Sequence, residues 1–332
     1  MSDTGWHQPD QPNDRNQQQP PMPPPPSWQA PQKPGVIALR PLSLTEIIDA
    51  AVKTMRSYPG VMLGVAAIVA TITAIIELPF QASIGDPTSD LGPNPTPTDV
   101  AETLEPLALG TGVGGILGLV AGAFLTGVLT TVVGKAVLGR QAPFSTVWAE
   151  VKPQLGRLIG LALFSIVPAL GLVLVVVAVG LVLPPLLLLV IPAAIVVGFW
   201  LYVLYFGLAA PALVLERCGV IESVKRSRVL VQRSWWRIFG ILLLTGILVV
   251  VISGIIQIPF GIIGGGASAF AGDPGGITFF GLVIAAIGAI IAATITQPFF
   301  AAVVALLYTD QRMRREGLDI ELARNAGNPP PQ

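Results

Sequence analysis

The sequence predicts an all-α integral membrane protein whose six transmembrane helices form three similar hairpins. Three observations indicate this class. Of the 332 residues, 52% are apolar and only 11% are charged, whereas soluble domains average about 25% charged residues. Six apolar stretches are long enough to cross the roughly 30 Å hydrocarbon core of a bilayer. The 19 Lys and Arg residues occur only at the two chain ends and in alternate connections between those stretches.

Both ends of the chain differ in composition from the middle. Residues 1–36 are rich in Pro and Gln and poor in aliphatic side chains, so we expect a disordered tail with polyproline-II character. No apolar core of a signal peptide occurs there. The tail is either a simple flexible segment or an arm that docks a protein partner through Trp6, Trp28 and the proline run. We expect a membrane domain over 37–322 and a disordered C-terminal tail over 323–332.

The membrane-spanning helices follow from hydropathy and from breaks in it. The prolines Pro184 and Pro185 divide one very long apolar stretch into two spans joined by a tight turn. The expected spans are about 60–83, 107–133, 158–183, 186–213, 238–263 and 277–308.

The positions of the cations predict the orientation of these spans. The loops 84–106, 184–185 and 264–276 contain no Lys or Arg, and positively charged loops stay on the cytoplasmic side. A model with six spans places all 19 cations on that side. We therefore expect both termini to be cytoplasmic.

A repeat predicts the hairpin architecture. When span 1 is aligned with span 5, the motif Glu77-Leu78-Pro79-Phe80 meets Gln257-Ile258-Pro259-Phe260. Each of these spans follows an amphipathic segment. The first has a capping box formed by Ser43 and Glu46, and the second places Val220, Ile221, Val224, Val231 and Trp235 on one face. A weaker amphipathic segment, 145–152, precedes span 3. We expect three units, each with an interfacial helix followed by a hairpin.

Three polar side chains lie inside the apolar stretches: Glu77, Gln257 and Gln297. Polar groups inside a membrane are costly and often functional, and each precedes a proline by one or two positions. They form either a converging polar site or separate hydrogen bonds at helix kinks. Gly114, Gly118 and Gly122 recur on one face of span 2, which predicts close approach of another helix.

The segment 220–237 is the clearest candidate for binding lipid headgroups. It combines two tryptophans with several cations, each worth about 1 kcal/mol beside an anionic leaflet. Ordinary anchoring at the inner interface is the alternative. The candidate contacts are Lys225, Arg226, Arg228, Arg233 and Arg237.

Composition excludes several other classes. The single cysteine, Cys218, leaves no internal disulfide, and the single histidine, His7, lies in the tail. No nucleophile–base pair or metal cluster is visible, and a net charge of zero argues against a nucleic-acid binder. The motif from Gly110 to Gly115 matches a dinucleotide fingerprint but opens a membrane span instead of following a strand. We expect no cofactor and no metal.

Two border motifs carry a resemblance to a known family. The segments 40–49, leading to Tyr58-Pro59-Gly60, and 306–319 resemble the membrane domain of glycerophosphoryl diester phosphodiesterases, especially stand-alone actinobacterial versions. The resemblance covers about 36–322 and implies a bacterial plasma membrane. In that family a separate soluble domain carries catalysis. Since only about 20 residues follow span 6 here, we expect no phosphodiesterase activity.

These observations predict a non-enzymatic membrane protein that binds lipids or a protein partner as a scaffold. The alternative is a small transporter or channel, for a solute or a lipid, whose path is lined by Glu77, Gln257 and Gln297. A membrane enzyme ranks last.

Overall fold

The computed structural model describes residues 42–84, 97–137, 139–183, 186–270 and 278–317. Within them the chain is helical and contains no strand, as predicted. The helices are α1 Leu44–Ser57, α2 Pro59–Ile84, α3 Pro97–Val137, α4 Phe144–Val151, the 3₁₀ turn η1 Lys152–Gln154, α5 Leu155–Val182, α6 Leu187–Tyr205, α7 Ala209–Glu216, α8 Val220–Gln232, α9 Trp235–Phe270 and α10 Phe279–Glu316.

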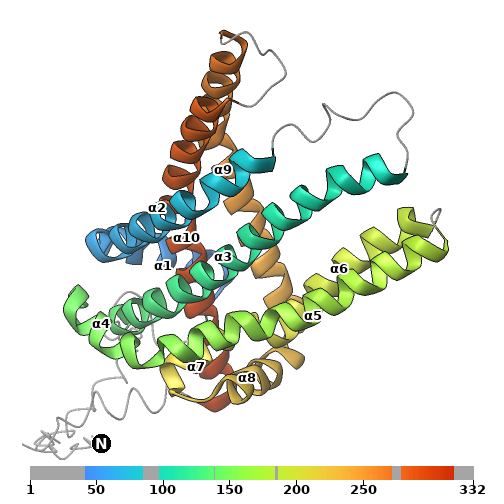
Figure 1. Cartoon of the computed structure of the whole chain (residues 1–332). Coiled ribbons are helices and arrows are strands. Elements are labelled where there is room, and N and C mark those ends of the chain that lie inside the picture. The colour runs from blue at the N-terminus through green and yellow to red at the C-terminus, as the bar shows by residue number, and fades with distance from the viewer. Residues whose placement is uncertain (1–41, 85–96, 138, 184–185, 271–277, 318–332) are drawn as a thin grey trace, which may run out of the picture.

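Six of the described segments are long and apolar enough to cross a membrane. They contain α2, α3, α5, α6, α9 and α10, and they pair in chain order into three hairpins (Figure 1). A short helix precedes each hairpin: α1, α4 and α8. The predicted fold class, an all-α membrane protein built from three helix-plus-hairpin units, is confirmed.

The first short helix begins as the sequence predicts. The Ser43 side chain accepts a hydrogen bond from the Glu46 amide, and the Glu46 carboxylate accepts one from the Ser43 amide at 2.8 Å. This capping box pairs backbone donors that the first helical turn cannot pair itself. Ile47 and Ala51 then face the protein interior.

The fourth predicted span, 186–213, is interrupted, and this differs from our expectation. Helix α6 ends at Tyr205, and α7 follows after three residues. The break coincides with a local change in backbone hydrogen bonding, since the Gly207 amide donates to the Tyr202 carbonyl, five residues back, at 3.0 Å. The Leu208 amide donates instead to the Ser227 hydroxyl at 3.2 Å. The short helix α7 is packed inside the protein, at the end of the apolar segment Leu189–Glu216 that is long enough to cross a membrane.

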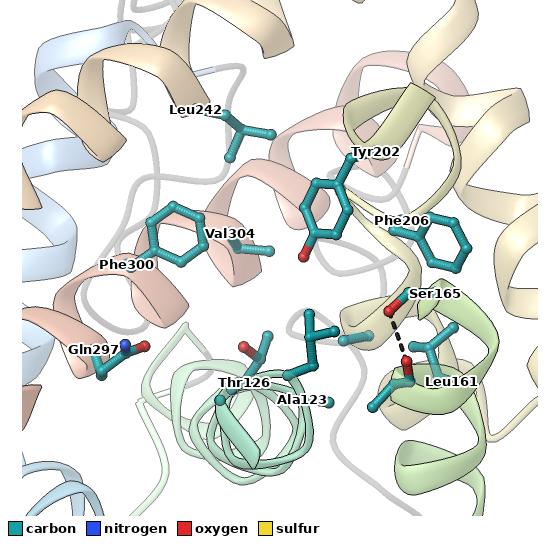
Figure 2. A pocket seen from close by; sticks show the side chains of 16 residues that line it. Ala123, Thr126, Leu161, Ser165, Tyr202, Phe206, Leu242, Gln297, Phe300 and Val304 are labelled. Carbon is teal, nitrogen blue, oxygen red and sulfur yellow. Dashed lines mark hydrogen bonds between the residues drawn. The ribbon is translucent and has the colours of Figure 1, made fainter. Parts of the chain in front are cut away.

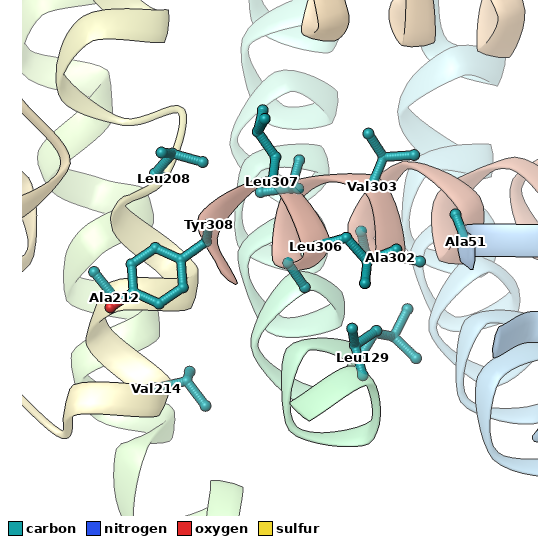
Figure 3. Close-up of a cluster of buried hydrophobic side chains, with 14 of the residues drawn as sticks. Ala51, Leu129, Leu208, Ala212, Val214, Ala302, Val303, Leu306, Leu307 and Tyr308 are labelled. Atoms are coloured by element: carbon teal, nitrogen blue, oxygen red, sulfur yellow. The ribbon is translucent and has the colours of Figure 1, made fainter. Parts of the chain in front are cut away.

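Helix α10 lies at the centre of the packed core. It contacts α1, α2, α3, α7, α8 and α9, and every residue from Ala301 to Tyr308 is buried. Figure 3 shows this stretch with Ala51 of α1 on one side and Ala212 of α7 on the other. A helix that is buried all round must be enclosed by neighbours. We use "basal layer" for the short helices α1, α4, α7 and α8 together with residues 301–316 of α10.

The hairpins separate away from the basal layer. Figure 1 shows the α5–α6 hairpin extending in a different direction from the α9–α10 hairpin. Large apolar side chains are exposed there, for example Val167, Leu189 and Val250 at 64%, 72% and 71%. Since lipid tails are as apolar as these side chains, such surfaces are stable within a bilayer. The separation leaves crevices between hairpins.

Candidate intramembrane site and basal ionic network

Two of the three predicted intramembrane polar residues lie in one cavity. A cavity of about 150 Å³ between α2, α3 and α10 is lined by Glu77 and Gln297. The Glu77 side chain faces α3, where a Cβ on Gly114 would lie 3.6 Å from its Oε1. Glu77 is half-buried and Gln297 is exposed, so the space that both side chains line is a half-open groove.

Gln257 is placed elsewhere. It is exposed on α9 and does not line that cavity. In the repeat it corresponds to Glu77, yet the partner helix differs: α3 offers glycines opposite Glu77, whereas α10 fits Gly288 against the ring of Phe260. Sequence equivalence therefore does not give the two positions the same surroundings.

The glycine face of α3 does not make the predicted close helix contact. A Cβ added to Gly118 or Gly122 would meet no atom within 4 Å. Both glycines instead line the Glu77 cavity and a second, neighbouring one. The prediction of close packing is wrong at these positions, because the absent side chains leave a space instead of admitting a helix.

The second cavity, of about 230 Å³, lies at the meeting point of α3, α5, α6 and α10 (Figure 2). We call it the central cavity. It shares Gln297 with the Glu77 cavity and adds three hydroxyl groups, those of Thr126, Ser165 and Tyr202. Figure 2 shows the Tyr202 hydroxyl directed into the space above α3, while Ser165 donates to the Ala162 carbonyl.

A third hollow, the α6–α9 crevice, adjoins the central cavity. Its volume is about 360 Å³, and both spaces are lined by Tyr202, Leu242 and Phe300. The remaining lining residues are apolar or glycine: Phe199, Val203, Leu243, Gly246, Ile247, Val250 and Val251. The three spaces thus run from an apolar crevice, through a polar cavity, to a carboxylate.

Two of the predicted lipid-binding arginines pair with carboxylates of the protein. Arg226 contacts Glu216, at 3.0 Å, and Glu316. Arg237 donates to Asp310 and to the Leu42 carbonyl, the latter at 2.7 Å. Both guanidinium groups therefore hold the basal layer together.

Asp310 is the centre of this network, and sequence reasoning missed it. Its side chain is fully buried and accepts hydrogen bonds from Arg237, from Arg314 at 3.0 Å and from the Leu42 amide at 2.8 Å. Arg314 also donates to the Leu42 carbonyl at 2.8 Å. The available signal was the Asp310–Arg314 spacing of four residues, which places the pair on one helix face.

A second ionic group lies beside the first. The Tyr308 hydroxyl donates to Glu216, which also accepts from Arg226. Arg312 pairs with Glu316 at 2.9 Å. Together the two groups join α7, α8, α9 and α10.

The other three predicted lipid contacts remain exposed: Lys225, Arg228 and Arg233. Arg228 lies over the Tyr205 ring, 5.6 Å from its centroid. The exposed face of α8 differs from the predicted one, because Ile221 is 62% exposed while Ser223 and Ser227 are buried. Packing against α7 turns the two serines inward, and Ser227 binds the backbone there.

Aromatic side chains cluster where α8 leads into α9. Trp235 packs on Phe239 with ring centroids 4.7 Å apart and also contacts Trp200 of α6 at 6.4 Å. Trp236 is 78% exposed. Tryptophans concentrate at membrane–water interfaces, so this cluster marks an interfacial level at the basal layer.

Cys218 lies between α7 and α8, and its thiol is half-buried. Burial, together with the nearby carboxylates Glu216 and Glu222, raises the pKa of the Cys218 thiol. A raised pKa keeps the thiol protonated at neutral pH and lowers its reactivity. Among the described residues, no group of three His, Cys, Asp or Glu side chains is placed to hold a metal ion.

No curated protein and no solved structure matches this chain. One family model does, over residues 42–311, which include every described helix except the last residues of α10. The cavities, the exposed face of α8, Asp310 and Glu216 lie within this match, whereas Arg312, Arg314 and Glu316 lie beyond its end. The chain therefore belongs to the family described as Domain of unknown function (DUF7847).

Proposed function

We propose that this protein is a non-enzymatic scaffold of the bacterial plasma membrane that binds anionic lipid headgroups at its cytoplasmic face. One observation carries the proposal. Lys225, Arg228 and Arg233 stay exposed on α8 beside the interfacial tryptophans, whereas Arg226 and Arg237 are neutralised by carboxylates. The exposed cations are the ones free to meet a membrane surface.

The exposed face of α8 combines two kinds of side chain. Ile221 and Val229 are 62% and 58% exposed and lie among the three cations. An interfacial helix binds by burying such apolar groups and by attracting anionic lipids. Three cations at about 1 kcal/mol each favour an anionic leaflet over a neutral one.

The test compares lipid retention by variants with equal charge loss. The triple variant Lys225→Gln, Arg228→Gln, Arg233→Gln is purified in mild detergent and given equal amounts of phosphatidylglycerol and phosphatidylcholine. Native mass spectrometry then measures the retained lipids. We expect the wild type to prefer phosphatidylglycerol and the α8 triple variant to lose that preference several-fold.

A matched control removes three exposed cations elsewhere in the basal region, through Lys53→Gln, Arg56→Gln and Lys152→Gln. It is expected to keep the preference. Equal lipid selectivity in the wild type and the α8 triple variant would overturn the proposal.

The competing function is a transporter or channel. It is favoured by the placement of Glu77 and Gln297 in one cavity. Proteoliposomes loaded with a pH-sensitive dye report proton flux, and a quenching assay with a fluorescent phosphatidylcholine reports lipid movement. A transporter predicts flux that falls in Glu77→Ala, and flux equal to that of empty liposomes counts against it.

The resemblance to phosphodiesterase membrane domains supports a membrane role without adding catalysis. The proposed partner arm, residues 1–36, lies outside the described residues. Co-purification of the full chain with and without that segment, followed by protein mass spectrometry, tests whether it recruits a partner.

A further inference from the structure

We propose that the central cavity and the α6–α9 crevice form a binding site for a single membrane amphiphile with a hydroxyl-bearing headgroup of no net charge. The hydrocarbon chain lies in the crevice and the headgroup lies in the cavity. This site is separate from the α8 surface and does not depend on lipid binding there.

The crevice and the central cavity adjoin each other, because Tyr202, Leu242 and Phe300 line both spaces. A ligand that fills both spaces passes these three side chains. The crevice is apolar along α6 and α9, so it suits a hydrocarbon chain.

The crevice is accessible from the surface of α9. Residues of α9 that line the crevice are also exposed on the surface of the protein, with Ile247 at 51% and Val250 at 71%. That surface belongs to a transmembrane helix and therefore faces lipid. A hydrocarbon chain can enter sideways from the bilayer without crossing water.

The central cavity offers polar groups that suit an uncharged headgroup. The central cavity presents three hydroxyls and one amide, those of Thr126, Ser165, Tyr202 and Gln297. These groups form hydrogen bonds without carrying charge, and the Ser165 hydroxyl, which already donates to the Ala162 carbonyl, can accept one from a ligand. A sugar or glycerol headgroup matches them, since each of its hydroxyls also donates and accepts.

The charges around the site disfavour an anionic headgroup. None of the described residues that line the three spaces is Lys or Arg, and the adjoining cavity holds the Glu77 carboxylate. An anionic phosphate there would lie at the depth of the membrane-spanning helices, without a counter-ion and near a like charge, which is costly in a low-dielectric site. The site therefore rejects anionic phospholipids, in contrast to α8.

Three glycines line the proposed site where larger side chains would reduce its volume. A Cβ at Gly118 or Gly122 on α3, or at Gly246 on α9, would meet no atom within 4 Å, and all three residues line these spaces. Larger side chains would project into the volume that the ligand needs. Glycine at these positions keeps the site open.

The experiment uses the purified full-length protein and four lipids with identical acyl chains: diacylglycerol, monoglucosyl diacylglycerol, phosphatidylglycerol and a cationic trimethylammonium analogue. Native mass spectrometry measures the lipid retained per protein, with the α8 triple variant as the background so that phosphatidylglycerol held at α8 is not counted. We expect retention of one monoglucosyl diacylglycerol or diacylglycerol, at least tenfold above phosphatidylglycerol at this site. Retention that is equal for all four lipids, or strongest for the cationic one, would overturn the headgroup assignment.

Matched variants locate the binding. Gly246→Leu fills the crevice, and Gly254→Leu is its control on the same helix, because neither added Cβ meets an atom and Gly254 does not line the described spaces. Gln297→Leu removes a headgroup contact, and Gln257→Leu is its control, because Gln257 is also exposed but lines none of the three described spaces. We expect at least a tenfold loss in the first member of each pair and no change in the second.

A milder variant keeps the test informative if Gly246→Leu fails to fold. Tyr202→Phe removes one hydroxyl without adding volume, and its expected effect is a several-fold loss of glucolipid retention. Unchanged retention in both Tyr202→Phe and Gln297→Leu contradicts the site. The α8 triple variant is expected to retain the glucolipid normally, so failure of the surface proposal is distinguishable from failure of this one.

Discussion

Single side chains connect distant parts of this chain. The Asp310 carboxylate binds the Leu42 amide, 268 positions away, and pairs with arginines from α9 and α10. Both arginines also donate to the Leu42 carbonyl. One fully buried carboxylate therefore fixes the start of the membrane domain to its last helix.

Replacement of this carboxylate tests its structural role. Asp310→Asn leaves Arg237 and Arg314 without their counter-charge, and breaking one partner of a buried ion pair costs about 3–5 kcal/mol. We expect the lower end of that range, because both arginine side chains are about one-third exposed, at 31% and 36%. The midpoint of thermal unfolding in detergent should fall by several degrees.

The control for this variant is Asp49→Asn, which changes an exposed carboxylate on α1. Its unfolding midpoint is expected to stay within a degree of wild type. If Asp310→Asn behaves like Asp49→Asn, the network does not stabilise the basal layer.

At the scale of helices, glycines serve two opposite purposes. Those on α3 at positions 118 and 122 leave open space, whereas Gly264 on α9 permits direct backbone contact with α10. A Cβ at Gly264 would lie 2.9 Å from the Gly281 carbonyl oxygen. A backbone atom cannot move aside as a flexible side chain can, so the α9–α10 hairpin requires glycine there.

Alanine substitution separates these purposes within one helix. Gly264→Ala forces α9 away from α10, and overpacking of this kind costs about 1–3 kcal/mol. Gly261→Ala adds a methyl group to open space and should be neutral or stabilising by up to about 1 kcal/mol, because Ala favours helix over Gly. Thermal unfolding of the two variants should therefore shift in opposite directions, and equal shifts would argue against close packing at Gly264.

At the scale of the whole molecule, packing and exposure are divided between two regions. The basal layer contains the buried C-terminal part of α10 and the carboxylates Asp310 and Glu216 with their ion pairs, while the hairpins spread beyond it with apolar side chains exposed. The proposed orientation places the basal layer in the cytoplasm. This division explains how exposed cations and open crevices occur in one small protein.

Labelling of single cysteines tests the orientation. In a Cys218→Ser background, Asp49→Cys lies on α1 and Ala82→Cys lies at the opposite end of α2, and both positions are exposed. A membrane-impermeant maleimide added to intact cells should label Ala82→Cys, and should label Asp49→Cys only after lysis. The reverse pattern would place the basal layer outside.

Local patterns in the sequence were sufficient for most of the fold. Six spans, three short helices before the hairpins, the Ser43–Glu46 capping box and the buried face around Ile47 all follow from hydropathy and periodicity over fewer than about 30 residues. The break before α7 was missed, because it involves backbone hydrogen bonds of Gly207 and Leu208 that leave the hydropathy unchanged.

The candidate site was only partly predictable. Hydropathy singles out Glu77, Gln257 and Gln297 as polar residues in apolar segments but assigns no neighbours to them. The structure brings the first and third together and places Gln257 on α9, outside that cavity. Likewise, no sequence pattern separates Arg226 and Arg237, which are paired inside the protein, from Lys225, Arg228 and Arg233.

The sequence alone therefore determined that this is a six-span membrane protein built from three similar units, with its cations segregated to alternate connections. Only the tertiary structure decided which polar groups share a cavity, which cations are neutralised and which glycines leave a space. The physical reason is that membrane insertion depends on the composition of each segment, whereas these contacts depend on how each helix is rotated about its axis. That rotation is set by packing between segments far apart in the chain, as for Leu42 and Asp310.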